Sequence, residues 1–389
     1  MNLVNIDGPR RCKKEELPQV IALVDDEMRQ GTGQTMLTDY PLVYQDANLE
    51  NIHVIAVGGK IVSVVPFIPR QVTMDECRFI VGIISPTATH PDHRKKGYAM
   101  QCLNQCLKKM DESGIDLSVL WTKIETFPFY EKTGYQAARS QGWIYRCSNQ
   151  DARLFKNHGE EIVAYNPKNN RYIKDIQAMH EREIYGILRT PEEYPALFGL
   201  PKTNTLIALR NGLSEAYLVV SRSINKPGIL EGGGKETAVE TLMNRALSGL
   251  KDNNYLDVHD NLTETTPGNL LRRKMPERKQ PPEAGPMMIR INNVGGFFHK
   301  IAKALEKQNV GGDRKFSITV TDTDEVISLK FSDDGLNLGT EKLDYNLEVT
   351  RRELTSIIFG AHPSRPVKTF EVLNNLFPLY FPIWILDHS

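Results

Sequence analysis

The sequence predicts a protein of mixed α/β (α+β) class with two or three domains. Apolar runs rich in β-branched residues, typical of buried strands, alternate with segments whose apolar residues recur every three or four positions, typical of amphipathic helices. The 389 residues are enough for two or three domains with their own cores, and a proline-rich break begins near residue 272. Hydrophobic residues make up 40% and charged residues 25%, which is typical of a soluble globular chain.

Charge and hydropathy exclude several classes of protein. The 48 basic and 48 acidic side chains cancel, so nothing global favours nucleic acid or an anionic membrane as a partner. No apolar run reaches the ~18 residues that a membrane span needs. Residues 1–14 lack the apolar centre of a signal peptide. We therefore expect a cytoplasmic protein.

The pattern of cysteines and histidines also favours a cytoplasmic protein. The five cysteines form no close C-x-x-C pair, and Cys102 and Cys106 lie one helical turn apart, where packing is the expected role. The nine histidines are scattered, and His90 and His93 flank a proline turn rather than a helix face. These patterns predict no metal site and favour a reducing compartment.

The first elements read as helix, loop and hairpin. Lys14–Gln30 carries apolar residues at helical spacing, and Gly31–Asp46 is a polar, turn-rich loop. Ile52–Val57 and Lys60–Pro66 read as two strands joined at Gly58-Gly59.

A strand, a basic loop and a helix then follow in a pattern suited to binding phosphate. Val81–Ile84 reads as a buried strand, and a turn at Pro91-Asp92 leads to a helix whose apolar face is formed by Met100, Leu103, Leu107 and Met110. Between them, Gly97 lets a ligand approach the backbone, and the first helical turn offers unpaired N–H groups. The loop is a plausible pyrophosphate cradle, and its residues are Arg94, Lys95, Lys96, Gly97, Tyr98 and Ala99.

Two further segments complete the first domain. Leu117–Thr122 reads as the next strand and Gly142–Cys147 as a closing strand. The whole arrangement resembles the acetyl-CoA-binding signature of the GCN5-related N-acetyltransferases (GNATs), in which Arg-x-x-Gly-x-Ala opens a helix. Phe129–Tyr135 is similar to the family segment in which a Tyr lies near the CoA sulfur.

The resemblance implies that residues 1–150 form a GNAT domain with acetyl-CoA as co-substrate. The binding residues it implies are those of the basic loop together with Ala88, Thr89 and His90, whose backbone N–H groups can polarise the thioester carbonyl. The region after the first helix usually helps to wall the acceptor site in such enzymes. Asp25, Asp26 and Glu27 then either present acid to an amine or lie on a solvated helix face.

Residues 151–275 repeat this order of elements without a copy of the signature. Ile173–Tyr185 reads as a helix, Thr205–Ala208 and Ala216–Arg222 as strands, and a helix follows Gly232-Gly233-Gly234. We interpret this segment as a second, degenerate GNAT-like domain. A separate nucleotide-binding loop at the Gly triplet is the alternative.

The last part of the chain consists of a linker and a further predicted domain. Residues 276–286 are polar and proline-rich, as in a linker. Residues 287–389 form a further predicted domain, with strands and helices listed here as Met287–Asn292, Val294–Gln308, Phe316–Thr321, Glu325–Phe331, Asn346–Val349, Arg351–Phe359 and Phe370–Leu376. The final residues are strongly apolar, so we expect them to be buried or docked.

Two GNAT-like domains, a proline-rich linker and a terminal domain that closes Leu-Phe-Pro…Trp-Ile-Leu-Asp resemble the Eis (enhanced intracellular survival) proteins. The resemblance implies a sterol-carrier-like third domain, a hexamer, and acetylation of aminoglycoside-, polyamine- or lysine-like amines by direct transfer. It places the general acid on Tyr130 and the general base on the terminal carboxylate of Ser389. Relatives tend to end in an aromatic residue, whereas this chain ends in Ser389.

The sequence leaves one alternative from another class. A lipid or small-ligand carrier with a remnant acetyltransferase domain is suggested by the abundance of Phe and Leu in Phe297–Leu305 and Phe370–Ile385. Core packing explains the same residues. Retention of Arg94, Gly97 and Tyr130 favours an active enzyme.

Overall fold

The computed structural model describes residues 5–74, 76–138, 143–182, 185–221, 228–252, 254–260, 265–280, 287–308 and 314–360, and then 373, 376, 377, 379, 381 and 385–388. The chain divides into two compact units. The first contains Met1–Arg139 and Ala284–Phe381, and the second contains Ser140–Glu283 and Pro382–Ser389.

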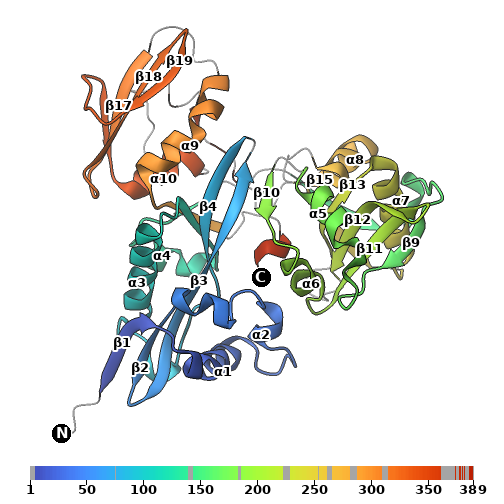
Figure 1. The fold of residues 1–389 in the computed structure, drawn as a ribbon, viewed down its shortest axis with the longest axis horizontal. Coiled ribbons are helices and arrows are strands. Elements are labelled where there is room, and N and C mark those ends of the chain that lie inside the picture. The colour runs from blue at the N-terminus through green and yellow to red at the C-terminus, as the bar shows by residue number, and fades with distance from the viewer. Residues whose placement is uncertain are drawn as a thin grey trace. The chain divides into compact units, whose positions relative to one another are not determined.

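The first unit is built on a sheet whose strands follow the order β1-β2-β3-β4-β6-β16-β7, with β5 also paired to β3 (Figure 1). The strands are β1 (Ile6–Arg11), β2 (Ile52–Val57), β3 (Lys60–Met74), β4 (Cys77–Ile84), β5 (Ala88–Thr89), β6 (Leu117–Trp121), β7 (Gln136–Ala137) and β16 (Met287–Ile291). The expected hairpin is confirmed: β2 and β3 are antiparallel, with Val57 opposite Lys60 across the Gly-Gly turn.

The helices that connect these strands are α1 (Leu17–Met28), α2 (Met36–Asp39), α3 (Tyr98–Glu112) and α4 (Phe127–Glu131). Helices α1 and α3 lie in segments predicted to be helical, whereas α2 lies in the segment predicted to be a loop and α4 was not predicted. The apolar face predicted for α3 is confirmed, because Leu103, Leu107 and Met110 are buried and the helix packs on β2 and β3. The helix also contacts β5, the strand that precedes the basic loop, where the site is expected.

The strand beside β6 differs from the expectation. Residues 143–147, expected to close the first sheet, belong to β8 (Trp143–Ser148), which pairs with β14 and β15 in the second unit. The place beside β6 is taken by β16, from far along the chain, with Met287 opposite Trp121 and Ile291 opposite Leu117. Four of the five β16 residues are buried, as suits an interior strand.

The remaining described part of the first unit is a four-stranded sheet with two helices. The strand order is β19-β18-β17-β20. The elements are α9 (Val294–Lys307), β17 (Arg314–Val320), β18 (Glu325–Ser332), β19 (Gly335–Gly339), β20 (Asn346–Val349) and α10 (Arg351–Phe359). The expected helix Phe370–Leu376 lies outside the described residues except for Leu373 and Leu376, which are buried.

The second unit holds its own sheet, in the order β15-β8-β14-β13-β12-β11-β9. The other strands of this sheet are β9 (Glu161–Ala164), β11 (Thr203–Arg210), β12 (Leu213–Ser221), β13 (Gly228–Gly234), β14 (Tyr255–Asp260) and β15 (Lys279–Gln280). A further strand of the unit, β10 (Tyr185–Leu188), is not part of this sheet. The helices of the unit are α5 (Ile173–His180), α6 (Glu193–Phe198), α7 (Glu236–Ser248), α8 (Thr266–Lys274) and the 3₁₀ helix η8 (Ile385–His388), which lies at the C label in Figure 1. Of the predicted linker, residues 279–280 form strand β15 and residues 281–286 lie outside the described residues.

The apolar end of the chain is buried where it is described, as expected. Leu376, Phe377, Leu379 and Phe381 are buried in the first unit, and Leu386 is buried in the second.

Candidate active site

Two neighbouring strands of the first unit separate at their carboxyl ends. β4 and β6 are parallel, and their pairing ends at Ile83 and Val119. Beyond that point the chain stays with β3, because the Ser85 N–H donates to the Pro66 carbonyl at 3.1 Å and β5 pairs with β3 as well. The carboxyl ends of parallel strands are where open α/β sheets bind ligands, so this splay is the candidate site.

The register of β5 leaves one backbone N–H directed away from β3. The His90 N–H donates to the Val62 carbonyl at 2.9 Å, and Ala88 pairs with Val64. Along an antiparallel strand, residues whose backbone groups bond the partner strand alternate with residues whose backbone groups point away from it. The backbone groups of Thr89, which lies between Ala88 and His90, therefore point away from β3. Its carbonyl accepts a bond from Arg94 Nε at 3.1 Å on that side. Of the three residues predicted to polarise the thioester, Thr89 therefore has the suitably directed N–H.

The basic loop leads from β5 into α3 through two residues with left-handed backbone conformations. We call residues 94–99 the phosphate loop. Lys95 has φ 62° and Gly97, the N-cap of α3, has φ 80°. The loop is exposed from Arg94 to Gly97, and the N–H groups that open α3 have no acceptor within the helix. An anionic diphosphate is the ligand that this arrangement suits.

A substitution at Gly97 tests this loop. An alanine in the left-handed region costs about 1–2 kcal/mol, and relief of that strain shifts the N–H groups that would face the phosphates. We expect Gly97→Ala to raise the Kd for acetyl-CoA roughly tenfold, the equivalent of about 1.4 kcal/mol. Gly114→Ala is the matched control, because Gly114 has φ +68° and open space around it at the other end of α3. Equal affinities of the two variants in calorimetry would contradict the assignment.

The acidic residues of α1 have mainly internal partners. Glu27 forms an ion pair with Arg94 of the phosphate loop. Asp25 accepts bonds from the Thr35 hydroxyl and from the first N–H of α2, both at 2.6 Å. Asp26 is exposed. Glu27 thus orients a cofactor-loop arginine, and Asp25 fixes the start of α2.

Tyr130 lies in α4, which follows β6 after a short 3₁₀ turn. Its side chain is 8% exposed, and its hydroxyl is hydrogen-bonded to Thr87. Burial raises the pKa of Tyr130, and the bond with Thr87 offsets part of that rise. The hydroxyl is therefore protonated at neutral pH, which is the state that a proton donor needs.

Arginines from the later part of the chain hold α4 in place. Arg290 in β16 is 6% exposed, and its Nε donates to the Thr133 carbonyl at 2.9 Å, just beyond the helix. Arg352 in α10 pairs with Glu131 of α4 at 3.0 Å. These two arginines could not be predicted from the sequence. The local pattern around residue 290 or 352 does not indicate a contact with a residue more than 150 positions earlier.

The cysteines in this region are not set up as nucleophiles. Cys106 Sγ lies 3.2 Å from His53 Nδ1. Burial raises the pKa of the Cys106 thiol well above its usual value and lowers the pKa of His53 to about 4, so both groups are neutral. Cys106 Sγ also donates to the Val65 carbonyl at 3.1 Å, and a histidine with so low a pKa is too weak a base to ionise a buried thiol, so a covalent route is not favoured. All five cysteines of the chain are buried and free.

The glycine triplet of the second unit has a packing explanation. A Cβ on Gly232 would lie 2.6 Å from the Leu218 side chain, and one on Gly234 would lie under 3.0 Å from the backbone of β12. The N–H of Lys235, at the start of α7, already donates to the Glu215 carbonyl at 2.8 Å. Close approach of β12 and β13 accounts for these glycines without a bound phosphate.

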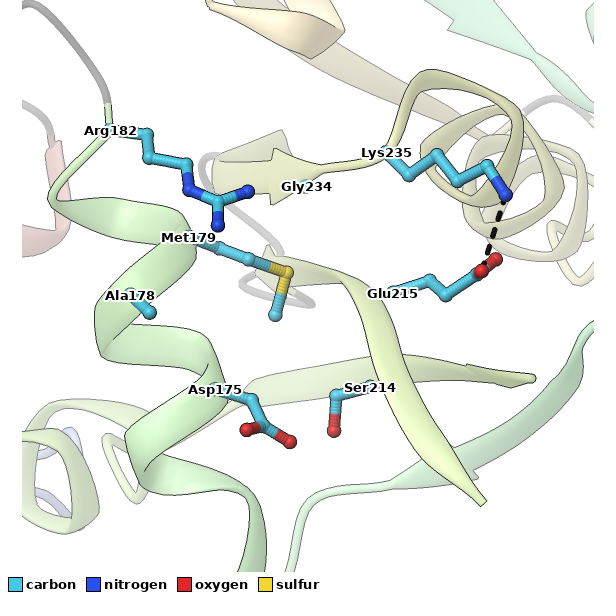
Figure 2. A pocket seen from close by; sticks show the side chains of 8 residues that line it. All are labelled: Asp175, Ala178, Met179, Arg182, Ser214, Glu215, Gly234 and Lys235. Atoms are coloured by element: carbon cyan, nitrogen blue, oxygen red, sulfur yellow. Dashed lines mark hydrogen bonds and ion pairs between the residues drawn. The ribbon is translucent and has the colours of Figure 1, made fainter. Parts of the chain in front are cut away.

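A pocket of about 520 Å³ adjoins this turn (Figure 2). Asp175 and Ser214 point toward each other across it, and Lys235 pairs with Glu215 at 3.2 Å. Two carboxylates line the pocket together with two cationic side chains, so its charge is balanced and does not favour an anion. The lining residues are Asp175, Ala178, Met179, Arg182, Ser214, Glu215, Gly234 and Lys235.

The predicted base lies at the edge of what the structure describes. Ser389 is outside the described residues, and the last described residues form η8 in the second unit. Asp387 of η8 is buried and accepts two bonds from Arg189, at 2.8 and 2.6 Å. The ion pair thus holds Asp387 of η8 in place within the second unit.

Neither a metal centre nor a membrane helix is found in the described part of the chain. No group of three or more His, Cys, Asp or Glu side chains there is arranged to hold a metal ion. None of the helices there has both the length and the apolar character needed to cross a bilayer.

Comparisons with known proteins agree with this geometry. Residues 9–138 match the family model described as an acetyltransferase (GNAT) domain. A GCN5-related N-acetyltransferase from Kribbella flavida has a TM-score of 0.69 at 12% identity, with 98% of each chain covered. One from Anabaena variabilis has a TM-score of 0.68 at 15% identity, covering 98% of this chain and 99% of that one. Eis1 from Mycobacterium abscessus has a TM-score of 0.59 at 12% identity, covering 98% of this chain and 97% of that one.

At such identities the solved structures establish a shared fold. A comparison with curated proteins found no match. The family match covers the splayed strands, the phosphate loop and Tyr130 together. Residues 9–138 are therefore an acetyltransferase domain of the GNAT type.

Proposed function

We propose that the chain is an Eis-type enzyme that transfers acetyl from acetyl-CoA directly to a primary amine of an aminoglycoside-, polyamine- or lysine-like molecule. The observation that carries this proposal is the arrangement at the splay of β4 and β6. The Thr89 N–H points away from β3, the protonated Tyr130 hydroxyl lies beside Thr87, and the phosphate loop opens α3. These are the oxyanion donor, the proton donor and the diphosphate cradle that acetyl transfer needs.

The proposed reaction is an addition to the thioester carbonyl followed by loss of the thiolate. The neutral amine nitrogen attacks the thioester carbonyl carbon, forming the C–N bond and a tetrahedral oxyanion that the Thr89 N–H stabilises. The carboxylate of Ser389, as the last residue, takes the proton that the amine loses. Collapse of the intermediate breaks the C–S bond, and Tyr130 gives its proton to the thiolate. The products are the acetylated amine and CoA; solvent takes the proton from the Ser389 carboxyl group and returns one to Tyr130.

We extend the proposal to the architecture. The second unit supports a degenerate GNAT-like domain, because β11, β12 and β13 are antiparallel neighbours, α7 follows, and β14 pairs parallel to β13. That is the order of β2, β3, β4, α3 and β6 in the first unit. A sterol-carrier-like part within residues 287–389, a hexameric assembly and a cytoplasmic location belong to the same proposal. Light scattering on the purified protein tests the assembly.

The carrier alternative has less support. Phe297 and Phe298, which would line a ligand cavity, are both fully buried, and their ring centroids are 5.7 Å apart. Phe297 also contacts Phe359, with centroids 5.6 Å apart. These contacts are those of a filled core.

The test of the function is release of free CoA thiol from acetyl-CoA in the presence of a panel of amines. The panel contains aminoglycosides, polyamines, lysine-bearing peptides and arylamines. Amine-dependent release with aminoglycosides, polyamines or lysine peptides is the expected result, and the ranking begins to define the acceptor. Thiol release that is independent of every amine, or failure to bind acetyl-CoA, would contradict the proposal.

A further inference from the structure

The helix that carries Tyr130 is too short to fix its own position. α4 has five residues, Phe127–Glu131, and isolated helices shorter than about 12 residues are marginal in water. The Tyr130 carbonyl accepts two bonds from Thr133, one from its N–H at 2.9 Å and one from its hydroxyl at 2.8 Å. The backbone of Tyr130 is therefore tied to the turn that follows α4, and whatever fixes Thr133 also fixes Tyr130.

A strand from outside the family match fixes this turn. The match ends at residue 138, whereas β16 lies far beyond it in the sequence. Arg290 of β16 donates from Nε to the Thr133 carbonyl at 2.9 Å, across 157 positions of sequence. The same strand pairs with β7, directly after the turn. Thr133 is thus held on both sides of its backbone, by Arg290 at its carbonyl and by Tyr130 at its N–H.

A second arginine, from α10, joins the two ends of the turn. Arg352 Nη2 lies 3.0 Å from Glu131 Oε1, at the end of α4, and its Nε donates to Gln136 Oε1 at 3.2 Å, at the start of β7. The Arg352 and Glu131 side chains are 45% and 27% exposed, so their pair adds little to stability. Its geometric effect is to fix the spacing between the end of α4 and the start of β7.

Arg290 occupies an unfavourable environment for a cation. Its side chain is 6% exposed, its Nη1 has no hydrogen-bond partner among the described residues, and Asp111 is 3.8 Å from that nitrogen. Arg351, which is 8% exposed, lies beside it, because a Cβ on Gly134 would be 3.5 Å from Arg290 Nε and 3.6 Å from Arg351 Cδ. Burial and the charge of Arg351 lower the pKa of Arg290 to about 10.

An apolar side chain would be more favourable for stability at position 290. Replacement of buried ionic groups by apolar residues of similar volume is often neutral or stabilising, because no charge then has to leave water. Residues that are unfavourable for the fold are expected mainly at sites that have a function. The function that the contacts of Arg290 allow is the placement of Thr133, and through it of Tyr130.

We propose that Arg290 and Arg352 are positioning residues that hold Tyr130 for proton transfer, so that β16 and α10 belong to the working acetyltransferase site. This inference rests on the proposed function, in which Tyr130 gives its proton to the leaving thiolate. The arginines act through Thr133 and Glu131 and are assigned no contact with the substrate. All of these residues lie in the first unit.

The experiment replaces Arg290 by methionine in the full chain, both in the original enzyme and in the Tyr130→Phe variant. Arg351→Met is the matched control, because Arg351 is similarly buried but donates to the Asn292 carbonyl, at 3.1 Å, rather than to the turn after α4. Four quantities are measured: kcat for the best amine of the panel, KM for acetyl-CoA, thermal stability, and hydrogen–deuterium exchange of the peptide covering residues 127–137.

We expect Arg290→Met to lower kcat roughly tenfold, since misplacement of a reacting group by about 1 Å can cost as much or more. KM for acetyl-CoA should stay within about twofold, because the phosphate loop is untouched. Exchange of residues 127–137 should become faster, whereas Tm should not fall, because a buried charge has been removed. In the Tyr130→Phe variant the same change should alter kcat less than about twofold, because no proton donor remains to be placed. Arg351→Met should leave kcat near normal.

Unchanged kcat in Arg290→Met would overturn the proposal, and so would an equal loss in the Tyr130→Phe variant or in Arg351→Met. The exchange measurement needs no turnover, and it therefore separates this inference from the proposed function. Faster exchange of residues 127–137 without acetylation of any amine would count against the proposed function and leave the support of α4 standing. Unchanged exchange would overturn that support.

A charge exchange at the second arginine covers the case in which Arg290→Met fails to fold. Glu131 and Arg352 are partly exposed, and Gln136 can bond either charge because an amide both donates and accepts. We expect Glu131→Arg and Arg352→Glu each to lower kcat about threefold, and the double variant to recover most of that loss, as for an exposed ion pair. A double variant as slow as the slower single variant would overturn the positioning role of Arg352.

Discussion

Replacement of Tyr130 by phenylalanine is expected to lower kcat by roughly 10²-fold or more, the usual contribution of a positioned general acid. The hydroxyl is the proton donor for the leaving thiolate in the proposed reaction. KM for acetyl-CoA should change little, because the phosphate loop is untouched. Steady-state kinetics at saturating amine measure both values.

Tyr135→Phe is the matched control for this variant. Tyr135 is also buried and close by, with its ring centroid 6.0 Å from that of Tyr130, and its hydroxyl donates to Ser118 Oγ at 2.7 Å. Its loss should reduce stability by about 1 kcal/mol with kcat near normal. If Tyr130→Phe keeps full kcat, or if both variants lose the same activity, Tyr130 is not the acid.

The pH dependence of kcat gives an independent check on the same residue. Burial raises the pKa of Tyr130 above its usual value of about 10. The protonated form is therefore present throughout the neutral and mildly alkaline range, and a fall in kcat from loss of this proton should occur only above pH 10. A descending limb below pH 9 that disappears in Tyr130→Phe would contradict the upward direction of the shift.

The local elements of this fold could be predicted because each is encoded by short-range patterns. The Gly58-Gly59 hairpin, the apolar face of α3 and the bounds of α10 follow from residues a few positions apart. The phosphate loop and Tyr130 were found for the same reason, since both belong to contiguous motifs.

The pairing of distant strands could not be predicted in this way. An apolar segment such as Met287–Ile291 favours a strand, but nothing in it specifies that its neighbours are β6 and β7 rather than a sheet of its own. The sheet to which β8 belongs could not be predicted for the same reason, because its residues are compatible with either sheet. The expected division at the proline-rich linker followed composition, whereas the chain crosses that linker to complete the first sheet.

The buried charge pairs could not be predicted for the same reason, because they also join distant parts of the chain. Arg189 and Asp387 are ordinary residues in sequence, and their role appears only when a fold brings them within 2.6 Å of each other. Arg290, which bonds the turn after α4, is another case. Such residues are selected by a three-dimensional environment, so a single sequence does not reveal them.

A short polar tail added after Ser389, such as Gly-Ser-Gly-Ser, is expected to lower kcat by roughly 10²-fold or more at neutral pH if the terminal carboxylate is the base. The tail carries a new carboxylate several residues away, so the charge of the protein is unchanged while the base is displaced. The buried ion pair of Arg189 with Asp387 is left intact, and thermal stability should therefore stay within error of the original. The same tail at the amino end is the control.

The pH profile of the tailed enzyme separates loss of the base from a blocked site. Without the base, the proton that the attacking amine loses must pass to hydroxide, whose concentration rises tenfold per pH unit. The rate of the tailed enzyme should therefore approach that of the original as pH increases, whereas a tail that merely blocks the amine would depress the rate equally at every pH. Replacement of the terminal carboxylate by a carboxamide through semisynthesis removes the charge without adding length and should give the same profile. Full kcat at neutral pH in either form would mean that another group, or water, takes the proton, and the fixed segment around Asp387 would then serve the fold of the second unit alone.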